Sequence, residues 1–431
     1  MSSMTHATAP ITELRERRRI LGPAYRLFYD QPVHLVRGED VWLFDTAGKR
    51  YLDAYNNVPV VGHANPAVVE ALARQASVLN THTRYLSEGV VEYAERLQAH
   101  FPAALDTVML TCTGSEANDL ALRIAFEATG RRGIIVTRNA YHGVTQALAD
   151  MSPSLRPVAS HVRTIEAPCH LAGSPEQVAD QFALLVDEAA RDLARAGIPV
   201  AVLIVDTVFA SDGIHIGYDE VLSRAAAQVR QHGGIFIADE VQGGFSRIGR
   251  HWWAFERDNV IPDMVSLGKP MGNGHPMAGL VVQRSLVEAF GKNCRYFNTF
   301  GGNTVSAAVG LAVLNELERM EMPAHVARVG EVMADRLLHL AKTVPCIGAV
   351  RGQGLYWGVD IRDPGGDSAR NGLLAQAISN GLRREGILIG VSGHQGDALK
   401  IRPPLTFQTE HVDILVSALA RQCQAVLPAV S

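Results

Sequence analysis

The middle of this 431-residue chain alternates between short β-branched runs and longer amphipathic stretches. The short runs have the length and composition of buried strands, and they occupy residues 108–110, 134–136, 201–205, 235–239, 263–267 and 280–282. Apolar residues at helical spacing lie between them, for example over residues 116–128 and 218–231. Strands that alternate with helices form βαβ units, so the chain is predicted to be an α/β protein with a mainly parallel sheet.

The two ends of the chain differ from the middle. Residues before about 54 predict a helix followed by a strand at 41–44 and a turn at 47–49. From about residue 305 a long helical pattern leads to residues 352–359, which are predicted to form a strand of a second sheet. We therefore expect a large central domain and a smaller domain built from both chain ends, with the segments 1–54, 55–304 and 305–431.

Composition and charge narrow the class of protein. Hydrophobic residues make up 47% and charged residues 19% of the chain, as in an ordinary globular protein. A net charge of −4 gives no electrostatic reason to expect nucleic acid as a partner. The five cysteines form no Cys-x-x-Cys pair, so neither a disulfide framework nor a metal site is expected, and a reducing cytoplasm fits. No apolar run approaches the roughly 18 residues that cross a bilayer, so no membrane association is expected.

Two of the predicted strands lead into residues that carry chemistry. Asp239 ends the run 235–239, and Lys269 follows the run 263–267. Because open α/β sheets bind ligands at the carboxyl ends of their strands, we expect both side chains in one site. A lysine amine can form a Schiff base with the aldehyde of pyridoxal phosphate, and a carboxylate can keep the pyridine nitrogen protonated. Taken singly, a solvated lysine and a helix-capping aspartate are the commoner interpretations, and only further motifs favour the cofactor.

Residues 113–118, Thr-Gly-Ser-Glu-Ala-Asn, follow a predicted strand and open a predicted helix. Gly114 permits a tight turn, and Ser115 can cap the helix while it donates to an anion. Exposed N–H groups and the helix dipole make such a helix start a natural phosphate site. The alternative is an ordinary helix cap, because a start of this kind is common.

Two further loops offer contacts to a flat, phosphorylated ring. Tyr141 and His142 close the next strand unit, where an aromatic side chain can stack on a heteroaromatic ring, although a buried structural Tyr-His pair is just as usual. Residues 298–303 supply the Thr299 hydroxyl and a glycine pair, and their alternative role is a plain turn. Each loop is ambiguous alone, but the order of the motifs along the chain is not.

Taken together, these motifs resemble those of the class III aminotransferases, which are fold-type-I pyridoxal-phosphate enzymes. The similarity extends from Val41 to about Leu405 and rests on five motifs in order, at residues 113–118, 141–143, 239–242, 267–269 and 299–302. It implies a mainly parallel seven-stranded sheet in the large domain, with a small α+β domain beside it. It also implies a homodimer or a larger assembly with active sites at the subunit interface.

The resemblance implies a role for most residues of these motifs. Lys269 is expected to hold the cofactor covalently and to move the proton, and Asp239 is expected to pair with the pyridine nitrogen. Gly114 and Ser115 are expected to bind the cofactor phosphate. Tyr141, with His142 beside it, and Val241 are expected to pack against the two faces of the ring. Gln242 is expected to approach the ring hydroxyl. Thr299 is expected to reach the phosphate of the cofactor in the neighbouring subunit.

Three departures from the family pattern are visible. Residues 206–213 replace the usual Glu-Pro-x-x-Gly-Glu-x-Gly stretch, Val391 stands where many members have a mobile arginine, and Thr304 replaces a usual proline.

Other segments narrow the resemblance to the branch that contains ethanolamine-phosphate phospho-lyase, and these segments are residues 22–23, 27–29, 56–58, 84–86, 269–276 and 400–404. That branch uses the same cofactor to eliminate phosphate rather than to transfer an amine.

The resemblance therefore implies an enzyme that eliminates phosphate from O-phosphoethanolamine or a similar phosphorylated amine. A phosphate dianion needs cationic partners, so the expected substrate contacts are Arg26, Lys400 and Arg402, with Asn57 as a neutral donor. Surface ion pairs are the alternative role for each cation.

The alternative activity is an aminotransferase that moves an amine from an amine or ω-amino acid to pyruvate or another oxo acid. A non-catalytic binding protein is disfavoured because both central cofactor residues are present, and a nicotinamide enzyme because no Gly-x-Gly-x-x-Gly follows a strand.

Overall fold

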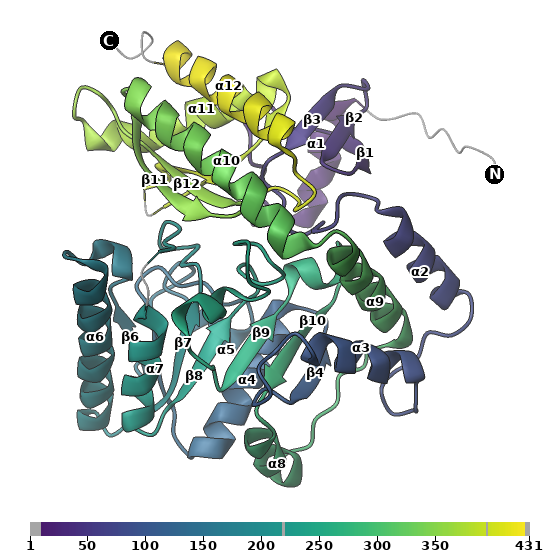
Figure 1. Cartoon of the computed structure of the whole chain (residues 1–431), viewed down its shortest axis with the longest axis vertical. Coiled ribbons are helices and arrows are strands. Elements are labelled where there is room, and N and C mark those ends of the chain that lie inside the picture. Colours follow the sequence, from purple (N-terminus) through teal and green to yellow (C-terminus); the bar gives the residue numbers. More distant parts are fainter. Residues whose placement is uncertain (1–9, 218–219, 394, 427–431) are drawn as a thin grey trace.

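The computed structural model describes residues 10–217, 220–393 and 395–426 (Figure 1). Its largest sheet has seven strands in the order β4-β10-β9-β8-β7-β5-β6. The pairs that β10 forms with β4 and β9 are antiparallel, and the other four pairs are parallel. The strands are β4 (Thr107–Thr111), β5 (Gly133–Thr137), β6 (Val162–Ile165), β7 (Val200–Asp206), β8 (Ile235–Asp239), β9 (Met264–Leu267) and β10 (Ala278–Val282).

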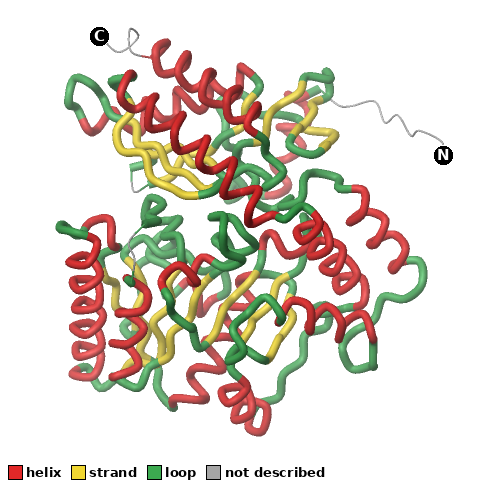
Figure 2. Tube along the Cα trace, viewed as in Figure 1, coloured by secondary structure: helices red, strands yellow, loops and turns green. Residues whose placement is uncertain are grey.

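Helices cover both faces of this sheet (Figure 2). Helices α4 (Gly114–Thr129) and α8 (Arg284–Asn293) pack in one apolar cluster with Ile235 and Ile237 of β8. Helices α6 (Pro175–Arg195) and α7 (Val221–Gln231) pack in another cluster with Phe236 of the same strand. A strand buried on both faces needs an almost continuous apolar sequence, and this requirement explains the runs that made the strands visible in the sequence.

Further helices flank the β4 edge of the sheet and the short loops above it. Helix α9 (Thr304–Arg319) contacts both α2 (Pro66–Ala76) and α3 (Glu88–Gln98), and α5 (Gln146–Ala149) contacts α4. At the start of α9, the Thr304 N–H donates to the Thr81 carbonyl at 3.2 Å, and its hydroxyl donates to the Leu79 carbonyl at 2.6 Å. A proline at this position would lack the N–H that ties the 79–81 loop to the helix.

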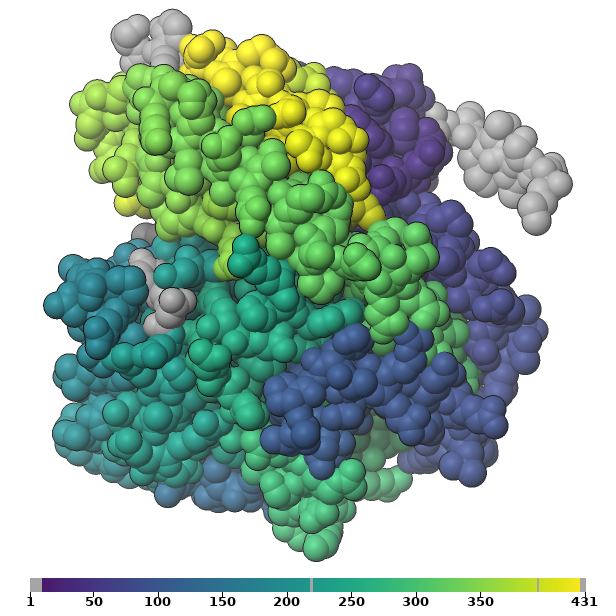
Figure 3. All heavy atoms as spheres, in the orientation of Figure 1, coloured from purple at the N-terminus to yellow at the C-terminus, as the bar shows by residue number. Residues whose placement is uncertain are grey.

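Both ends of the chain contribute to the remaining part of the molecule, where their colours lie side by side (Figure 3). One four-stranded sheet has the order β1 (Leu35–Glu39), β2 (Trp42–Asp45), β3 (Arg50–Asp53) and β13 (Ile387–Leu388). The other has the order β11 (Ile347–Gln353), β12 (Tyr356–Ile361), β15 (Ala398–Ile401) and β14 (Gly390–Ser392). Helices of this part are α1 (Ile11–Arg17), α10 (Met322–Thr343), α11 (Asn371–Glu385) and α12 (Thr409–Val426).

The α/β class and the mainly parallel seven-stranded sheet are confirmed, with corrections at single elements. Strand β6 was not predicted. The prediction of one strand at 352–359 was wrong, because Gly354 takes a left-handed φ of 56° and divides the segment into the hairpin of β11 and β12. Helix α7 begins at Val221, and the predicted residues Tyr218 and Asp219 lie outside the described residues.

The domain boundaries at residues 54 and 304 stay predictions, and the terminal segments 1–9 and 427–431 lie outside the described residues. Among the described residues, each helix is too short or too polar to span a membrane.

Candidate active site

The predicted cofactor residues meet where strands β7, β8 and β9 end. A cavity of about 110 Å³ lies there, and two larger cavities of about 720 and 610 Å³ lie elsewhere and share none of its residues. Its lining consists of Gly114, Ser115, Asn118, Tyr141, His142, Gly143, Asp206, Asp239, Val241, Gln242 and Lys269. Carboxyl ends of parallel strands are the usual ligand sites of such sheets, as expected from the sequence. Thr299 is the one predicted cofactor residue that does not line this cavity.

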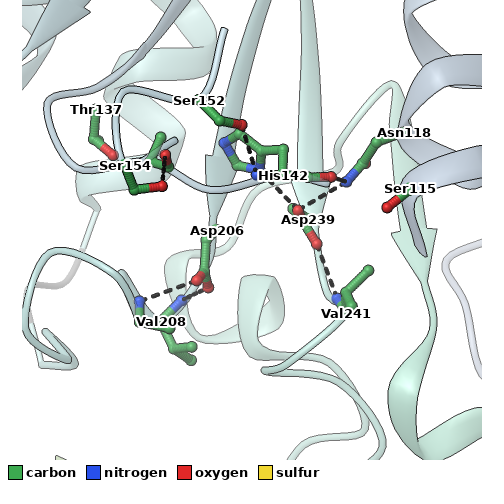
Figure 4. A network of polar contacts seen from close by, with 12 residues as sticks. Ser115, Asn118, Thr137, His142, Ser152, Ser154, Asp206, Val208, Asp239 and Val241 are labelled. Atoms are coloured by element: carbon green, nitrogen blue, oxygen red, sulfur yellow. Dashed lines mark hydrogen bonds and ion pairs between the residues drawn. The ribbon is translucent and has the colours of Figure 1, made fainter. Parts of the chain in front are cut away.

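Asp239 lies at the floor of the cavity and is held by three donors (Figure 4). Its Oδ2 accepts from the Asn118 amide at 2.9 Å and lies 2.7 Å from His142 Nδ1, and its Oδ1 accepts from the Val241 N–H at 3.0 Å. Burial alone would raise the pKa of Asp239, but the hydrogen bond and charge of His142 and the Val241 N–H leave it below its usual value. The carboxylate therefore stays ionised and can hold a protonated ring nitrogen.

Lys269 begins the short 3₁₀ helix η4 (Lys269–Gly272) directly after β9. Its amine makes no hydrogen bond within the described residues. Burial lowers the pKa of Lys269, and the charge of Arg402 lowers it further, while Asp239 and Asp206 act in the opposite direction. A lysine that loses its proton more readily is a better nucleophile and a better base, so the site suits covalent chemistry at this amine.

Asp206 is a site residue that the sequence interpretation missed. It ends β7, pairs in register with Asp239 of β8, and lines the same cavity. Its carboxylate accepts from the N–H groups of Val208 at 3.1 Å and Ala210 at 3.0 Å (Figure 4). Burial and the neighbouring Asp239 raise its pKa. The rule that found Asp239, an acid at the end of a buried strand, also applies here, but residues 206–213 were treated only as a departure from the family pattern.

The start of α4 differs from its prediction in two details. Thr113, not Ser115, caps the helix: its hydroxyl accepts from the Glu116 N–H at 3.1 Å, and Glu116 accepts in return from the Thr113 N–H. Gly114 has no left-handed φ, so the predicted tight turn is not the reason for this glycine. A methyl group there would lie 2.9 Å from the side chain of Val241, so glycine is needed for close approach.

Ser115 and Tyr141 both line the cavity. The Ser115 hydroxyl accepts from the Val144 N–H at 3.2 Å, which leaves its proton available to an anion. Tyr141 is 36% exposed, and partial burial, followed by the charge of Asp239, raises its pKa. The contacts of both residues with a cofactor stay predictions.

Arg402, Asn57 and Gln242 form a network behind this cavity. Arg402 Nη1 donates to the Gln242 side-chain oxygen at 2.6 Å and to the Asn57 side-chain oxygen at 3.1 Å. Tyr356, which the sequence interpretation missed, donates to the same Gln242 oxygen at 3.2 Å. Because arginine can only donate, this end of the Gln242 amide must be its oxygen, and the amide N–H groups remain for a ligand. Arg402 Nε and Asn57 Nδ2 are buried and have no partner among the described residues.

Lys400 lies two residues before Arg402, on β15. Its ammonium group donates to the Ala210 carbonyl at 3.2 Å, and its side chain lies over the Tyr356 ring at 5.8 Å. Burial, and then the charge of Arg402, lowers the pKa of Lys400 to about 7. Lys400 and Arg402 are each 9% exposed, and among the described residues neither forms an ion pair with a carboxylate.

Two predicted residues lie apart from this group. Arg26 is exposed in the loop after η1 (Arg18–Leu21), and its side chain makes no hydrogen bond within the described residues. Thr299 is exposed beside Phe300, which is 70% exposed. The single chain therefore assembles the cofactor residues and three of the four predicted substrate residues, and leaves these two side chains at its surface.

Comparisons with known proteins identify the family of the chain. A solved structure described as a phospholyase from Arthrobacter in complex with phosphoethanolamine superposes with a TM-score of 0.91 and 42% identity, over 95% of this chain and 99% of that one. An ethanolamine-phosphate phospho-lyase homolog 1 from Caenorhabditis elegans is 33% identical over 97% of this chain and 96% of its own length. An alanine–glyoxylate aminotransferase 2-like protein from Drosophila melanogaster is 35% identical over 93% and 84%. The profile of the family described as aminotransferase class-III matches residues 28–422, and the chain belongs to that family.

Proposed function

We propose that the protein is a pyridoxal-phosphate-dependent lyase that releases phosphate from O-phosphoethanolamine or a similar phosphorylated amine. The observation that carries this proposal is the pair of buried cations, Lys400 and Arg402, close to the cavity that holds Lys269. Burying a charge without an opposite charge beside it is costly, and neither side chain forms an ion pair with a carboxylate among the described residues, so the two cations favour a place where an anion binds. A phosphate dianion would compensate both charges, and a simple amine would compensate neither.

The residues of the cavity fit pyridoxal phosphate, which supplies an aldehyde and an electron-accepting ring when it is bound. We assign Lys269 as the covalent partner because its amine is unengaged and its pKa is lowered by burial. We assign Asp239 as the partner of the ring nitrogen because three donors keep it ionised. We assign Gly114 and Ser115 to the cofactor phosphate. We assign Tyr141, His142 and Val241 to the faces of the ring, and Gln242 to the ring hydroxyl.

In this proposal the residues of the chain divide the work of an elimination. Lys269 removes the proton from the carbon next to the amine nitrogen, and Asp239 keeps the ring able to withdraw electrons. Lys400, Arg402 and Asn57 hold the phosphate group. The carbon–oxygen bond at the adjacent carbon breaks, and its electron pair stays on the phosphate oxygen. One water is consumed overall, and the products from O-phosphoethanolamine are acetaldehyde, ammonia and phosphate.

Two of the comparisons support this activity, and one supports its rival. The Arthrobacter structure, at 42% identity, was solved with phosphoethanolamine, and the Caenorhabditis relative has a phospho-lyase name. The rival activity is amine transfer to pyruvate or another oxo acid, and the aminotransferase name of the Drosophila relative favours it. That reaction needs a carboxylate site, for which Arg402 would serve, but it gives no role to the second buried cation at Lys400.

We further propose that the active protein is a homodimer or a larger assembly. Thr299 lies beside a patch of exposed apolar side chains, with Phe300 at 70%, Tyr85 at 66% and Leu86 fully exposed. The Arg84 guanidinium lies 3.8 Å from the centre of the Phe297 ring, so the loops that carry these side chains are adjacent. Apolar patches of this kind commonly mark interfaces, and a partner covering this one would bring Thr299 toward a second active site.

The experiment is to incubate the cofactor-loaded enzyme with O-phosphoethanolamine in the absence of any oxo acid and to measure released phosphate and acetaldehyde. Release of both in equal amounts over many turnovers is expected, and Lys269→Ala should abolish it. If neither product appears, and an amine reaches pyruvate once pyruvate is added, the protein is an aminotransferase and the lyase proposal is wrong.

A further inference from the structure

We propose that Lys400 is the acid that protonates the departing phosphate, an inference that rests on the proposed lyase activity. When the carbon–oxygen bond breaks, its electron pair passes to the ester oxygen of the phosphate. A phosphate ester dianion would then leave as a trianion, which is a poor leaving group. A proton delivered to that oxygen as the bond breaks allows the group to leave as hydrogen phosphate instead, and this role requires a positioned acid close to the bound phosphate.

The position of Lys400 meets this requirement. Lys400 lies in β15, which ends at Ile401, and Arg402 follows the strand directly. The Ala210 carbonyl accepts from the Lys400 ammonium at 3.2 Å, while the Ala210 N–H donates to Asp206 in the cavity wall at 3.0 Å. One residue, Ala210, therefore lies between Lys400 and Asp206, which lines the cavity, and Arg402 contacts Gln242, another residue of the lining.

The groups around Lys400 leave its proton transferable. The charges that act on it come from Arg402 just after its own strand, from Asp206 at the end of β7 and from Lys269 after β9, and the Tyr356 ring of β12 lies beneath it. Burial and the two cations lower its pKa to about 7, and a bound phosphate dianion would raise it again. The lysine would thus be protonated when substrate is bound and able to give up that proton as the new negative charge develops.

Two other groups compete for this role. A guanidinium does not release its proton in proteins, so Arg402 can bind the phosphate but cannot protonate it. Lys269 receives a proton from the substrate carbon and could pass it to the phosphate. Substitution at Lys400 distinguishes these possibilities, because a proton supplied by Lys269 would not depend on whether residue 400 is an acid.

The test is Lys400→Arg, which keeps the positive charge but removes the transferable proton. Acetaldehyde release is measured from two esters of ethanolamine, the phosphate and the sulfate, because sulfate leaves as a stable dianion and needs no proton. We expect kcat for the phosphate ester to fall by about a hundredfold or more, and kcat for the sulfate ester to stay within about threefold of wild type. Lys49→Arg, an exposed site whose amine bonds to the Arg384 carbonyl, is the matched control.

Each other outcome is informative. An equal loss with both esters would mean that Lys400 only shapes the site, and an unchanged kcat with the phosphate ester would mean that another group supplies the proton; both overturn the assignment. If Lys400→Arg does not fold, Lys400→Gln is compared on the same two esters with the same expected contrast. No phosphate release by the wild-type enzyme contradicts the lyase activity itself.

The pH profile provides a second readout if the wild-type enzyme does not accept the sulfate ester. An acid must be protonated to act, so kcat of the wild-type enzyme with the phosphate ester should fall as pH rises and Lys400 loses its proton. This descending limb should be absent from the Lys400→Arg profile. A limb at the same pH in both enzymes would assign the proton to another group and would overturn the proposal.

Discussion

Replacement of Arg402 by lysine tests how the substrate anion is bound. Arg402 uses Nη1 for Gln242 and Asn57, while its Nε is buried and has no partner among the described residues. The Nε–H is therefore an unused donor on the edge that it forms with Nη2, and a guanidinium edge can donate two parallel hydrogen bonds to one phosphate. Lysine keeps the charge but cannot present this edge. Loss of one charge-assisted hydrogen bond is worth about 1.5–3 kcal/mol, so kcat/KM should fall by about 10- to 150-fold.

The assay is phosphate release from O-phosphoethanolamine at several substrate concentrations, with each enzyme at equal cofactor occupancy. Cofactor occupancy must be matched because Arg402 also orients Gln242 in the cavity wall. Arg351→Lys is the control, since Arg351 lies in β11 of the sheet whose strand β15 leads into Arg402, but it is paired with Asp360. We expect the control to stay within about threefold of wild type. If Arg402→Lys also stays within about threefold, Arg402 does not bind the phosphate through its edge and the reasoning is wrong.

Three further predictions concern cofactor binding and stability. Asn118→Ala removes one donor from Asp239 and should weaken cofactor affinity by about tenfold or more, as measured by equilibrium dialysis; unchanged affinity would refute the support role. Burial raises the pKa of Glu240 to about 7, so the folded protein binds a proton that the unfolded chain has lost between about pH 4.5 and 7. Wild-type stability should therefore decline relative to Glu240→Gln as pH rises through that window, and parallel melting-temperature curves would contradict this. Thr304→Pro should cost about 2–4 kcal/mol through lost hydrogen bonds to the 79–81 loop, visible as a lower melting temperature, and an unchanged melting temperature would show that the loop contacts contribute little.

The sheet could be predicted from sequence because its strands are buried on both faces. Runs such as Val200–Asp206 and Ile235–Asp239 are apolar up to their final aspartate, as a short strand buried on both faces requires. Strand β6, Val162–Ile165, is an edge strand of four residues with two partly exposed positions, so its apolar signal is weak. The β11–β12 hairpin was missed for a different reason, because the left-handed turn at Gly354 falls inside a segment that was predicted as one strand.

Some site residues could be predicted from their neighbours in the sequence, and others depend on contacts between distant parts of the chain. Asp239 and Lys269 follow apolar runs and carry their own signal, and Ser115 lies within a recognisable helix start. Nothing in the sequence around Tyr356 indicated a role in the site, because its hydrogen bond to Gln242 joins residues 114 positions apart and depends on how the two parts of the chain fold together. The sequence predicted Ser115 as the cap of helix α4, whereas Thr113 caps it. Either hydroxyl could cap this helix from its place in the motif, and only the backbone geometry decides between them.

The parallel pairing of β13 with β3 has a consequence for how this protein is made. Leu52 and Asp53 leave the ribosome early, but their partners, Ile387 and Leu388, are synthesised roughly 330 residues later. At about 5–20 residues per second the N-terminal strands wait for roughly 20–70 s before the sheet that they belong to can close. During that interval the edge of β3 is open to pairing with other nascent chains, so the yield of native protein should depend on translation rate and on chaperones that shield exposed strand edges.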